Sequence, residues 1–298
     1  MEAPAGAGVR LRAVTLIRLA FSPDSDDLFM FWPLLSGKVA SGQYRFEHVR
    51  ADTETLNRRA LQGDLDVVAI SIATYPAVAK DYLLLPHGGS VGRGYGPALV
   101  ASGPRALATL TDKAIAVPGA GTTAYLVLRL LLPSFRPVFI PISPYSRVFS
   151  ALRDGEVDAA LLIHEGRLTY EKEGFALVAD IGQAFAYLTG GLPLPLGGNV
   201  IRRGLGDRAI ADISQLLRRS IEYALAHRDT LIDELLAKET RREAKIDRAT
   251  LDRYLAMYAN GDTLGYPEDA RRAVHELFAR GRAAGLLSEP DAPLTWAP

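Results

Sequence analysis

The chain has 298 residues, 48% of them hydrophobic, which is enough to bury the core of one large domain or of two lobes of ordinary size. Lysine plus arginine and aspartate plus glutamate both number 34, so the net charge is zero, and neither a nucleic acid nor a membrane is expected as a partner bound by bulk charge. Cysteine is absent, which excludes disulfides, thiolate metal sites and a cysteine nucleophile.

The N-terminal residues do not have the pattern of a signal peptide. Arg18 interrupts their apolar stretch, which continues directly into the first predicted strand. No run of eighteen apolar residues occurs elsewhere in the sequence, so no transmembrane helix is predicted. We therefore expect residues 1–14 to be a frayed start and the protein to be cytoplasmic.

Short apolar runs alternate with helical patterns over the first two thirds of the chain, as is typical of α/β units with largely parallel strands. Strands are predicted at residues 16–22, 44–51, 66–71, 114–117, 136–142 and 158–164. Helices are predicted between them, at 27–37 (capped by the preceding aspartates), 53–63, 122–132 and 145–155. The last third is nearly all amphipathic helix, predicted at 210–227, 229–239, 249–260 and 267–281.

The sequence contains a hidden repeat. Residues 60–71 and 151–164 share a helix end, a glycine turn, an aspartate and an aliphatic strand. One supersecondary unit is therefore predicted to occur twice, once in each of two lobes. We expect lobe 1 to combine residues 1–101 with 198–298, including the C-terminal helices, and lobe 2 to span 102–197.

Polar candidates follow the predicted strands of both units. Open α/β sheets bind ligands beyond the carboxyl ends of their strands, and in two facing lobes those ends would share one cleft. Ser71 and His164 each end a strand, and residues 119–123 follow another. A histidine can also be a core residue under a loop with both ring nitrogens satisfied, but its place at a strand end favours a functional role for His164.

The segment VPGAGTTAY (117–125) runs from a strand into a helix through two glycines and two threonines. Free N–H groups at a helix start carry positive potential, and Thr122 and Thr123 add hydroxyl donors, so a carboxylate or phosphate would fit. The alternative is an ordinary N-cap, for which threonine is favoured. The chain lacks G-x-x-x-x-G-K-[ST], so no nucleotide P-loop is predicted.

Three further patterns are weaker. The aspartates of PDSDD (23–27) fit acidic N-capping, although Asp24, Asp26 or Asp27 could also contact ligand hydroxyls. The five glycines of residues 87–97 indicate a turn near the passage between the lobes rather than a phosphate loop. The histidines lack zinc-site spacing, so no metal is expected.

Several motifs, in order along residues 16–230, are similar to those of one known family. They are FSPDSDDLFMF, DTETLNRRALQGDL, GRGYGP, VPGAGTTAYL, LLIHEGRLTY, GLPLPLGG and RRSIEYALAH. Together they resemble the 1,4-dihydroxy-6-naphthoate synthases of the futalosine route to menaquinone. The most specific patterns are IHE-x-R-x-TY and PG-x-x-TTAY.

The resemblance implies an α/β fold of the periplasmic-binding-protein-like (type II) kind, with two lobes around a central cleft and C-terminal helices. It implies a carbon–carbon lyase that needs no cofactor and converts cyclic dehypoxanthine futalosine to 1,4-dihydroxy-6-naphthoate, releasing a small sugar-derived fragment. The family's proton acceptor falls on His164. We expect a small carboxylated substrate to be bound by Asp24, Asp27, Ala69, Ile70, Ser71, Thr122 and Thr123.

The chain departs from the family's common pattern at three positions. Asp26 stands where an asparagine is common, Leu28 where a threonine is, and Ala69 where many members carry a lysine. Losing a cation and gaining an acid near a carboxylated substrate is unfavourable by Coulomb's law. A related substrate therefore stays open, as do two other functions: a solute-binding protein for a small carboxylate, and a chorismate dehydratase-like enzyme on the same fold.

Overall fold

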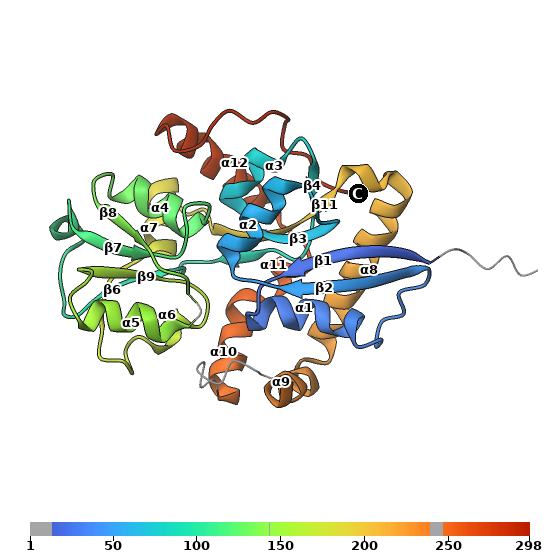
Figure 1. Ribbon diagram of the computed structural model, residues 1–298, viewed down its shortest axis with the longest axis horizontal. Helices are drawn as coiled ribbons and strands as arrows, with labels where there is room; N and C mark the ends of the chain where they lie inside the picture. The colour runs from blue at the N-terminus through green and yellow to red at the C-terminus, as the bar shows by residue number, and fades with distance from the viewer. Residues whose placement is uncertain (1–13, 143, 239–246) are drawn as a thin grey trace, which may run out of the picture.

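The computed structural model describes residues 14–142, 144–238 and 247–298, so nearly all of the predicted frayed start lies outside the described residues. Two lobes lie side by side, with the C-terminal helices packed around lobe 1 (Figure 1). Within these described residues each lobe is built on one mixed sheet, of six strands in lobe 1 and five in lobe 2.

Lobe 1 begins with a β-α-β-α-β unit. Its elements are β1 (Thr15–Phe21), α1 (Ser25–Leu35), β2 (Tyr44–Arg50), α2 (Thr53–Gln62) and β3 (Val67–Ser71). β1 lies between β2 and β3 and is parallel to both. The short elements η1 (Ile72–Thr74), α3 (Tyr75–Val78), β4 (Tyr82–Leu84) and β5 (Ser90–Gly92) follow.

Lobe 2 repeats the unit. After β6 (Ala98–Ala101) and η2 (Leu107–Leu110) come β7 (Ala114–Val117), α4 (Thr123–Leu131), β8 (Arg136–Phe139), α5 (Tyr145–Arg153) and β9 (Ala159–Leu162). β7 lies between β8 and β9 and is parallel to both, as β1 is to its neighbours. The predicted repeat is thus confirmed in the topology of the sheets. α6 (Gly166–Thr169), β10 (Ala176–Asp180) and α7 (Ile181–Thr189) complete the lobe.

An antiparallel strand extends each unit beyond its third strand. β11 (Leu194–Arg202) pairs with β3 in lobe 1, and β6 pairs with β9 in lobe 2. Because β6 already belongs to the second sheet and β11 to the first, we propose that the chain crosses between the lobes a few residues before the predicted boundaries at 101/102 and 197/198.

The C-terminal helices pack around lobe 1. They are α8 (Asp207–Ala226), α9 (Arg228–Lys238), α10 (Arg248–Tyr258), α11 (Gly261–Leu264) and α12 (Glu268–Ala283), after the short η3 (Arg203–Leu205). α1 packs against α8, α9 and α10, and Asp26 in its first turn accepts a hydrogen bond from Tyr254 of α10. In the described part of the chain, no helix has the length and apolar character needed to cross a bilayer.

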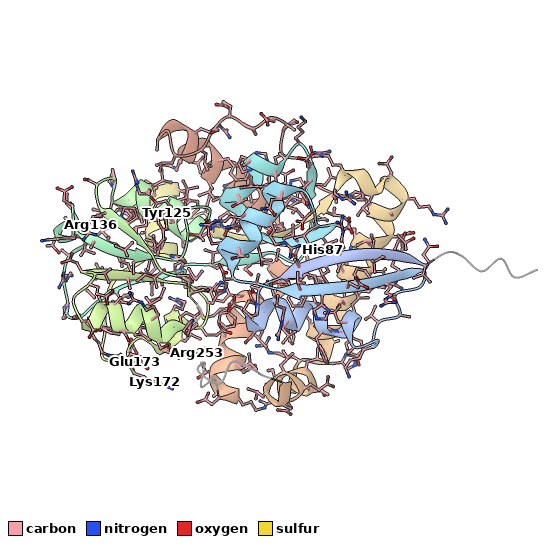
Figure 2. All side chains as sticks on the ribbon, viewed as in Figure 1. His87, Tyr125, Arg136, Lys172, Glu173 and Arg253 are labelled. Carbon is pink, nitrogen blue, oxygen red and sulfur yellow. The ribbon has the colours of Figure 1, made fainter. Side chains whose placement is uncertain are left out.

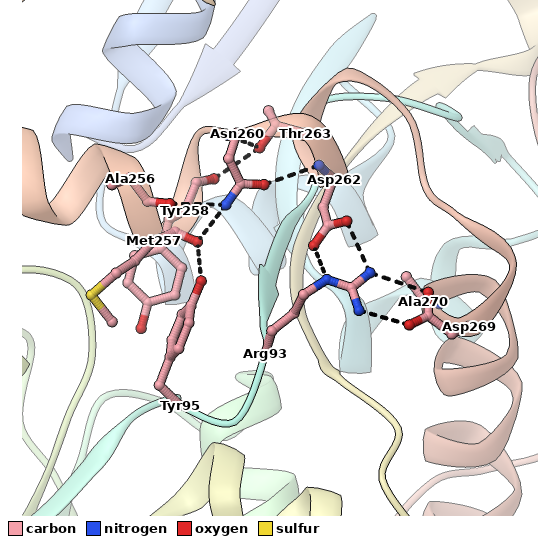
Figure 3. A network of polar contacts seen from close by, with 10 residues as sticks. All are labelled: Arg93, Tyr95, Ala256, Met257, Tyr258, Asn260, Asp262, Thr263, Asp269 and Ala270. Carbon is pink, nitrogen blue, oxygen red and sulfur yellow. Dashed lines mark hydrogen bonds and ion pairs between the residues drawn. The ribbon is translucent and has the colours of Figure 1, made fainter.

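The segment that crosses into lobe 2 is tied to these helices. Arg93 contacts the carboxylates of Asp262 at 2.6 Å and Asp269 at 2.7 Å, and the Tyr95 hydroxyl donates to the carbonyl of Met257 at 2.5 Å (Figure 3). A Cβ on Gly182 would lie 2.0 Å from the Tyr95 carbonyl, so only glycine fits there. These contacts hold α10 at the junction of the lobes.

The segment 87–97, predicted as a turn, also contains the short strand β5 (Ser90–Gly92).

Candidate active site

A cavity lies between the lobes, at the carboxyl ends of β3, β7 and β9. Its empty volume is about 730 Å³, including space open to solvent. Most of the predicted site residues line it: Asp27, Ala69, Ile70, Ser71, Thr122, Thr123 and His164. Among the described residues that line it, none is a lysine or an arginine.

His164 reaches from lobe 2 to groups outside that lobe. Its Nε2 lies 3.1 Å from the Thr53 hydroxyl and 3.2 Å from the carboxylate of Asp24, and its Nδ1 lies 3.3 Å from the Tyr254 hydroxyl. Both ring nitrogens thus have partners, as a core histidine would. The side chain is 18% exposed and lines the cavity, however, which a core histidine does not do.

Asp24 does not line the cavity, but its carboxylate lies 3.2 Å from Nε2 of the imidazole. It occupies the N-cap position of α1, yet its side chain makes no capping hydrogen bond, so the predicted aspartate cap is wrong for this residue. The side chain is 2% exposed and faces His164 instead. The carboxylate thus contacts an imidazole of the opposite lobe in place of the amides of α1.

Four carboxylates set the charge of the imidazole. Burial lowers the pKa of His164, but the negative charges of Asp24, Asp26, Glu165 and Asp27 outweigh burial, so the pKa is raised above its ordinary value of 6.5. These groups come from α1, its N-cap and the turn before α6. The site therefore stabilises an imidazolium.

A buried histidine of lobe 1 has its pKa shifted in the opposite direction. His87 is 2% exposed and lies within lobe 1, where its Nε2 is 3.2 Å from the Ser214 hydroxyl (Figure 2). Burial lowers the pKa of His87 to about 4, with the Arg218 charge acting in the same direction. Burial alone would therefore keep a histidine neutral, and it is the carboxylates that distinguish His164.

Asp26 and Asp27 form an acceptor-rich wall of the cavity. Asp26 accepts hydrogen bonds from the Tyr254 hydroxyl at 3.1 Å and the Ser90 hydroxyl at 2.9 Å. Asp27 accepts from the backbone N–H of Ser22 at 2.8 Å, and burial together with the charge of Asp26 raises its pKa to about 7. This wall suits ligand groups that donate hydrogen bonds.

The hydroxyl groups of Thr122 and Thr123 are hydrogen-bonded to other groups of the protein. The Thr122 hydroxyl caps α4, accepting from the Tyr125 amide at 3.2 Å, so the capping alternative holds for this residue. The Thr123 hydroxyl donates to the Leu196 carbonyl at 2.8 Å. The first-turn amides of Thr123 and Ala124 have no acceptor in their own helix and belong to residues that line the cavity. Free amides at a helix start suit an anion.

Ser71 offers a further donor. Its backbone N–H and its hydroxyl oxygen both bond to the side chain of Asn57, at 2.9 and 3.2 Å. Because the hydroxyl accepts from the Asn57 amide, its hydrogen is left to point elsewhere. Within the described residues no acceptor for that hydrogen is recorded, so it is available to a ligand.

Four functional residues were not predicted from the sequence. Thr53 follows a strand end and could have been found by the same rule as Ser71. Asn57 lies one turn further along α2 and gives no signal of its own. Tyr254 reaches the site only through the packing of α10. In a strand that continued through His164, Glu165 would point to the opposite face, but β9 ends at Leu162 and the Glu165 carboxylate contacts Ser25 of lobe 1.

No group of three histidine, aspartate or glutamate side chains in the described ranges is placed to hold a metal ion. The geometry instead joins a cavity-lining imidazole, carboxylates close to it and neutral donors across the cavity. Such an arrangement can move a proton and bind an anion.

Comparisons with known proteins show the family to which the chain belongs. A family model described as menaquinone biosynthesis matches residues 17–283. A 1,4-dihydroxy-6-naphthoate synthase of Thermus thermophilus is 40% identical over 278 residues, which cover 93% of this chain and 98% of the relative. A protein of the same name from Streptomyces coelicolor is 36% identical over 281 residues, covering 93% and 97%.

A solved structure extends the comparison to the fold. The alkanesulfonate-binding protein of Xanthomonas axonopodis pv. citri superposes with a TM-score of 0.70 at 16% identity, covering 93% of this chain and 95% of that one. The predicted two-lobed fold of periplasmic binding proteins, with C-terminal helices, is thereby confirmed.

Proposed function

The chain belongs to the menaquinone biosynthesis family, and from this membership we propose that it is a carbon–carbon lyase that converts cyclic dehypoxanthine futalosine to 1,4-dihydroxy-6-naphthoate. The single observation that carries the proposal is His164, a cavity-lining imidazole with Asp24 behind it. The curated relatives that carry this name match nearly the whole chain. The same family membership supports a cytoplasmic location for the protein.

His164 is the proton acceptor in this proposal. The Tyr254 hydroxyl donates to Asp26, so it receives the hydrogen of Nδ1, and we assign Nε2 as the atom that takes the proton. Asp24 and Thr53, both within 3.2 Å of Nε2, would stabilise the imidazolium that forms. A positioned base with a pKa near working pH typically contributes about 10² to 10⁴ in rate.

The two walls of the cavity suit different parts of the substrate. The amides at the start of α4 and the Ser71 hydroxyl are neutral donors, and they suit the carboxylate of the substrate. Asp26 and Asp27 are acceptors and suit hydroxyl groups of the sugar-derived part. The loss of the family's lysine at Ala69 is tolerable on this account, because helix amides replace the cation.

The two alternatives have less support. A protein that only captures a solute gains nothing from a carboxylate buried behind a cavity-lining imidazole, and its likeness to binding proteins, at 16% identity, is one of fold. A chorismate dehydratase-like activity is disfavoured because both curated relatives carry the naphthoate synthase name.

The test is direct. Purified protein is incubated with cyclic dehypoxanthine futalosine, and the naphthoate is sought by mass spectrometry, with chorismate as the competing substrate. Naphthoate from the first and no dehydration of the second is the expected result. A folded preparation that binds the first compound without converting it would support the solute-binding alternative and overturn the proposal.

A further inference from the structure

The turn that follows β9, here called the base turn (Ile163–Gly166), has an unusual backbone. His164 adopts φ +50°, and in the described part of the chain Asp112 is the one other non-glycine residue with positive φ. A residue with a side chain keeps this conformation only where its surroundings enforce it. The contacts around the base turn therefore decide where the imidazole lies.

Lobe 2 fixes the two ends of the base turn. The Tyr145 hydroxyl donates to the Ile163 carbonyl at 3.2 Å. A Cβ on Gly166 would lie 2.7 Å from the Tyr145 ring, so the ring packs directly on this glycine. These contacts hold the turn to its own lobe but leave the direction of His164 undetermined.

The middle of the base turn is fixed from the opposite lobe. The Glu165 carboxylate is 2% exposed and accepts from Ser25 of lobe 1, from its hydroxyl at 2.7 Å and its backbone N–H at 3.2 Å. Ser25 is the first residue of α1, where the helix dipole favours a negative charge. The pair can form only when the lobes are as close as they are here.

We infer that Glu165 is a positioning residue: by docking on the first turn of α1 it holds His164 in its left-handed conformation, and so places the base only when the lobes are closed. This inference rests on the proposed role of His164 as proton acceptor. It explains why one chain segment carries two adjacent ionisable side chains to lobe 1, one for chemistry and one for placement.

A second glutamate makes the reciprocal contact and serves as a comparison. Glu54 of lobe 1 accepts from the backbone N–H of Gly121 in lobe 2 at 2.9 Å. It also joins the lobes through a carboxylate and an amide, but it does not touch the base turn. Loss of Glu54 should therefore weaken closure without misplacing His164.

The experiment compares four variants for kcat and KM over a range of pH. In Glu165→Ala, kcat at its high-pH plateau should fall about 10- to 100-fold, the usual effect of a misplaced catalytic group. Glu165→Gln keeps an oxygen that can accept from Ser25, so its plateau should return close to that of the unaltered enzyme. Glu54→Ala should raise KM and leave the kcat plateau in place. Glu156→Ala, an exposed glutamate of lobe 2, controls for charge and folding.

The pH profile adds a readout that a merely structural role would not move. Titratable groups face His164 from α1 and its N-cap (Asp24, Asp26 and Asp27), from α10 (Tyr254) and from the base turn (Glu165). Removing the Glu165 charge lowers the pKa of His164, so the profile should move to lower pH in both Glu165 variants. It should stay in place in Glu54→Ala.

The inference is overturned if Glu165→Ala keeps its kcat plateau, or if it changes KM and kcat in the same pattern as Glu54→Ala. It is equally overturned if Glu165→Gln is as slow as Glu165→Ala. Should Glu165→Ala fail to fold, Ser25→Ala removes a single oxygen from the same contact. It must then lower the kcat plateau, and an unchanged plateau overturns the inference.

A measurement without substrate separates this inference from the proposed function. Imidazole NMR of the ligand-free protein should show a lower pKa for His164 in Glu165→Gln, and more than one ring environment in Glu165→Ala. If the unaltered protein makes no naphthoate, the proposed function falls while the NMR result still decides whether Glu165 positions His164. An unaltered His164 signal in Glu165→Ala overturns the positioning role alone.

Discussion

The two β-α-β-α-β units have the same strand order but opposite chemistry at equivalent positions. After β1 the chain reads PDSDD, and after β7 it reads PGAGTT. Each segment leads into a helix, yet the start of α1 is occupied by the Glu165 carboxylate, whereas the first amides of α4 belong to residues that line the cavity. A helix start is thus a general anion site, and the opposite lobe decides whether an internal carboxylate or a ligand fills it.

The last strands of the two units differ in the same way. β3 ends on Ser71, an extended residue held by Asn57, whereas β9 stops two residues before His164, which adopts a left-handed conformation. Ser71 offers a hydrogen-bond donor, and His164 offers a base. Under the proposed function, one strand end binds the substrate and the other carries the base, and substitutions at the two ends should therefore change different kinetic constants.

The largest effect is expected at His164. His164→Asn removes the base while keeping a polar side chain, so kcat should fall on the order of 10² to 10⁴ with substrate affinity nearly unchanged. His275→Asn, at an exposed position of α12, is the matched control. Turnover, substrate affinity and melting temperature would be measured for both. Full turnover per folded molecule of His164→Asn would return His164 to the role of a core residue.

Ser71→Ala should give the complementary result. It removes a hydroxyl donor from the carboxylate of the substrate, and a hydrogen bond to a charged group is worth about 1.5–3 kcal/mol, so affinity should fall roughly 10- to 100-fold at constant kcat. Binding of a neutral methyl ester of the substrate, which lacks the charge, should suffer less. An equal loss for acid and ester would show that the carboxylate lies elsewhere.

Asp24→Asn tests the carboxylate behind the base and should cost about tenfold in kcat, from a lost charge-assisted contact. The Asp24 charge raises the pKa of His164, and the unprotonated base prevails only above that pKa. Removing the charge lowers the pKa, so the rise of kcat with pH should begin at lower pH. A profile that stays in place, or moves to higher pH, would exclude Asp24 as the partner of His164.

The smallest effect is expected at the start of α4. Thr122→Val removes the N-cap and should reduce the free energy of unfolding by about 1 kcal/mol, while Thr122→Ser keeps the cap. Substrate affinity should change little in Thr122→Val, because the donors to the anion are amides. Denaturant unfolding and substrate titration of both variants provide the measurement. A large loss of affinity with unchanged stability would make the hydroxyl a substrate contact.

The sequence by itself determined the elements, the repeat and the edge at which the site lies. Aliphatic runs such as residues 66–71 and 114–117 form strands close to their predicted bounds. They could be predicted because the spacing of hydrophobic residues along a short segment shows which of its side chains are buried. The rule that ligands bind beyond strand ends then selected Ser71 and His164, which line one cavity. The same rule could have selected Thr53, which also follows a strand end and lines the cavity.

Only the tertiary structure decided which groups meet the imidazole. Tyr254 lies 90 residues from His164 in the chain and reaches it because α10 packs beside α1, a long-range contact that no local pattern encodes. The direction of Glu165 depends on its contact with Ser25 of the opposite lobe, and the positive φ of His164 beside it ends the alternation of side chains along a strand. Asp24 could be read as a cap from its position, but closure of the lobes placed His164 against it. Local periodicity reports which face is buried, whereas the partner across a cleft depends on how two separately folded sheets meet.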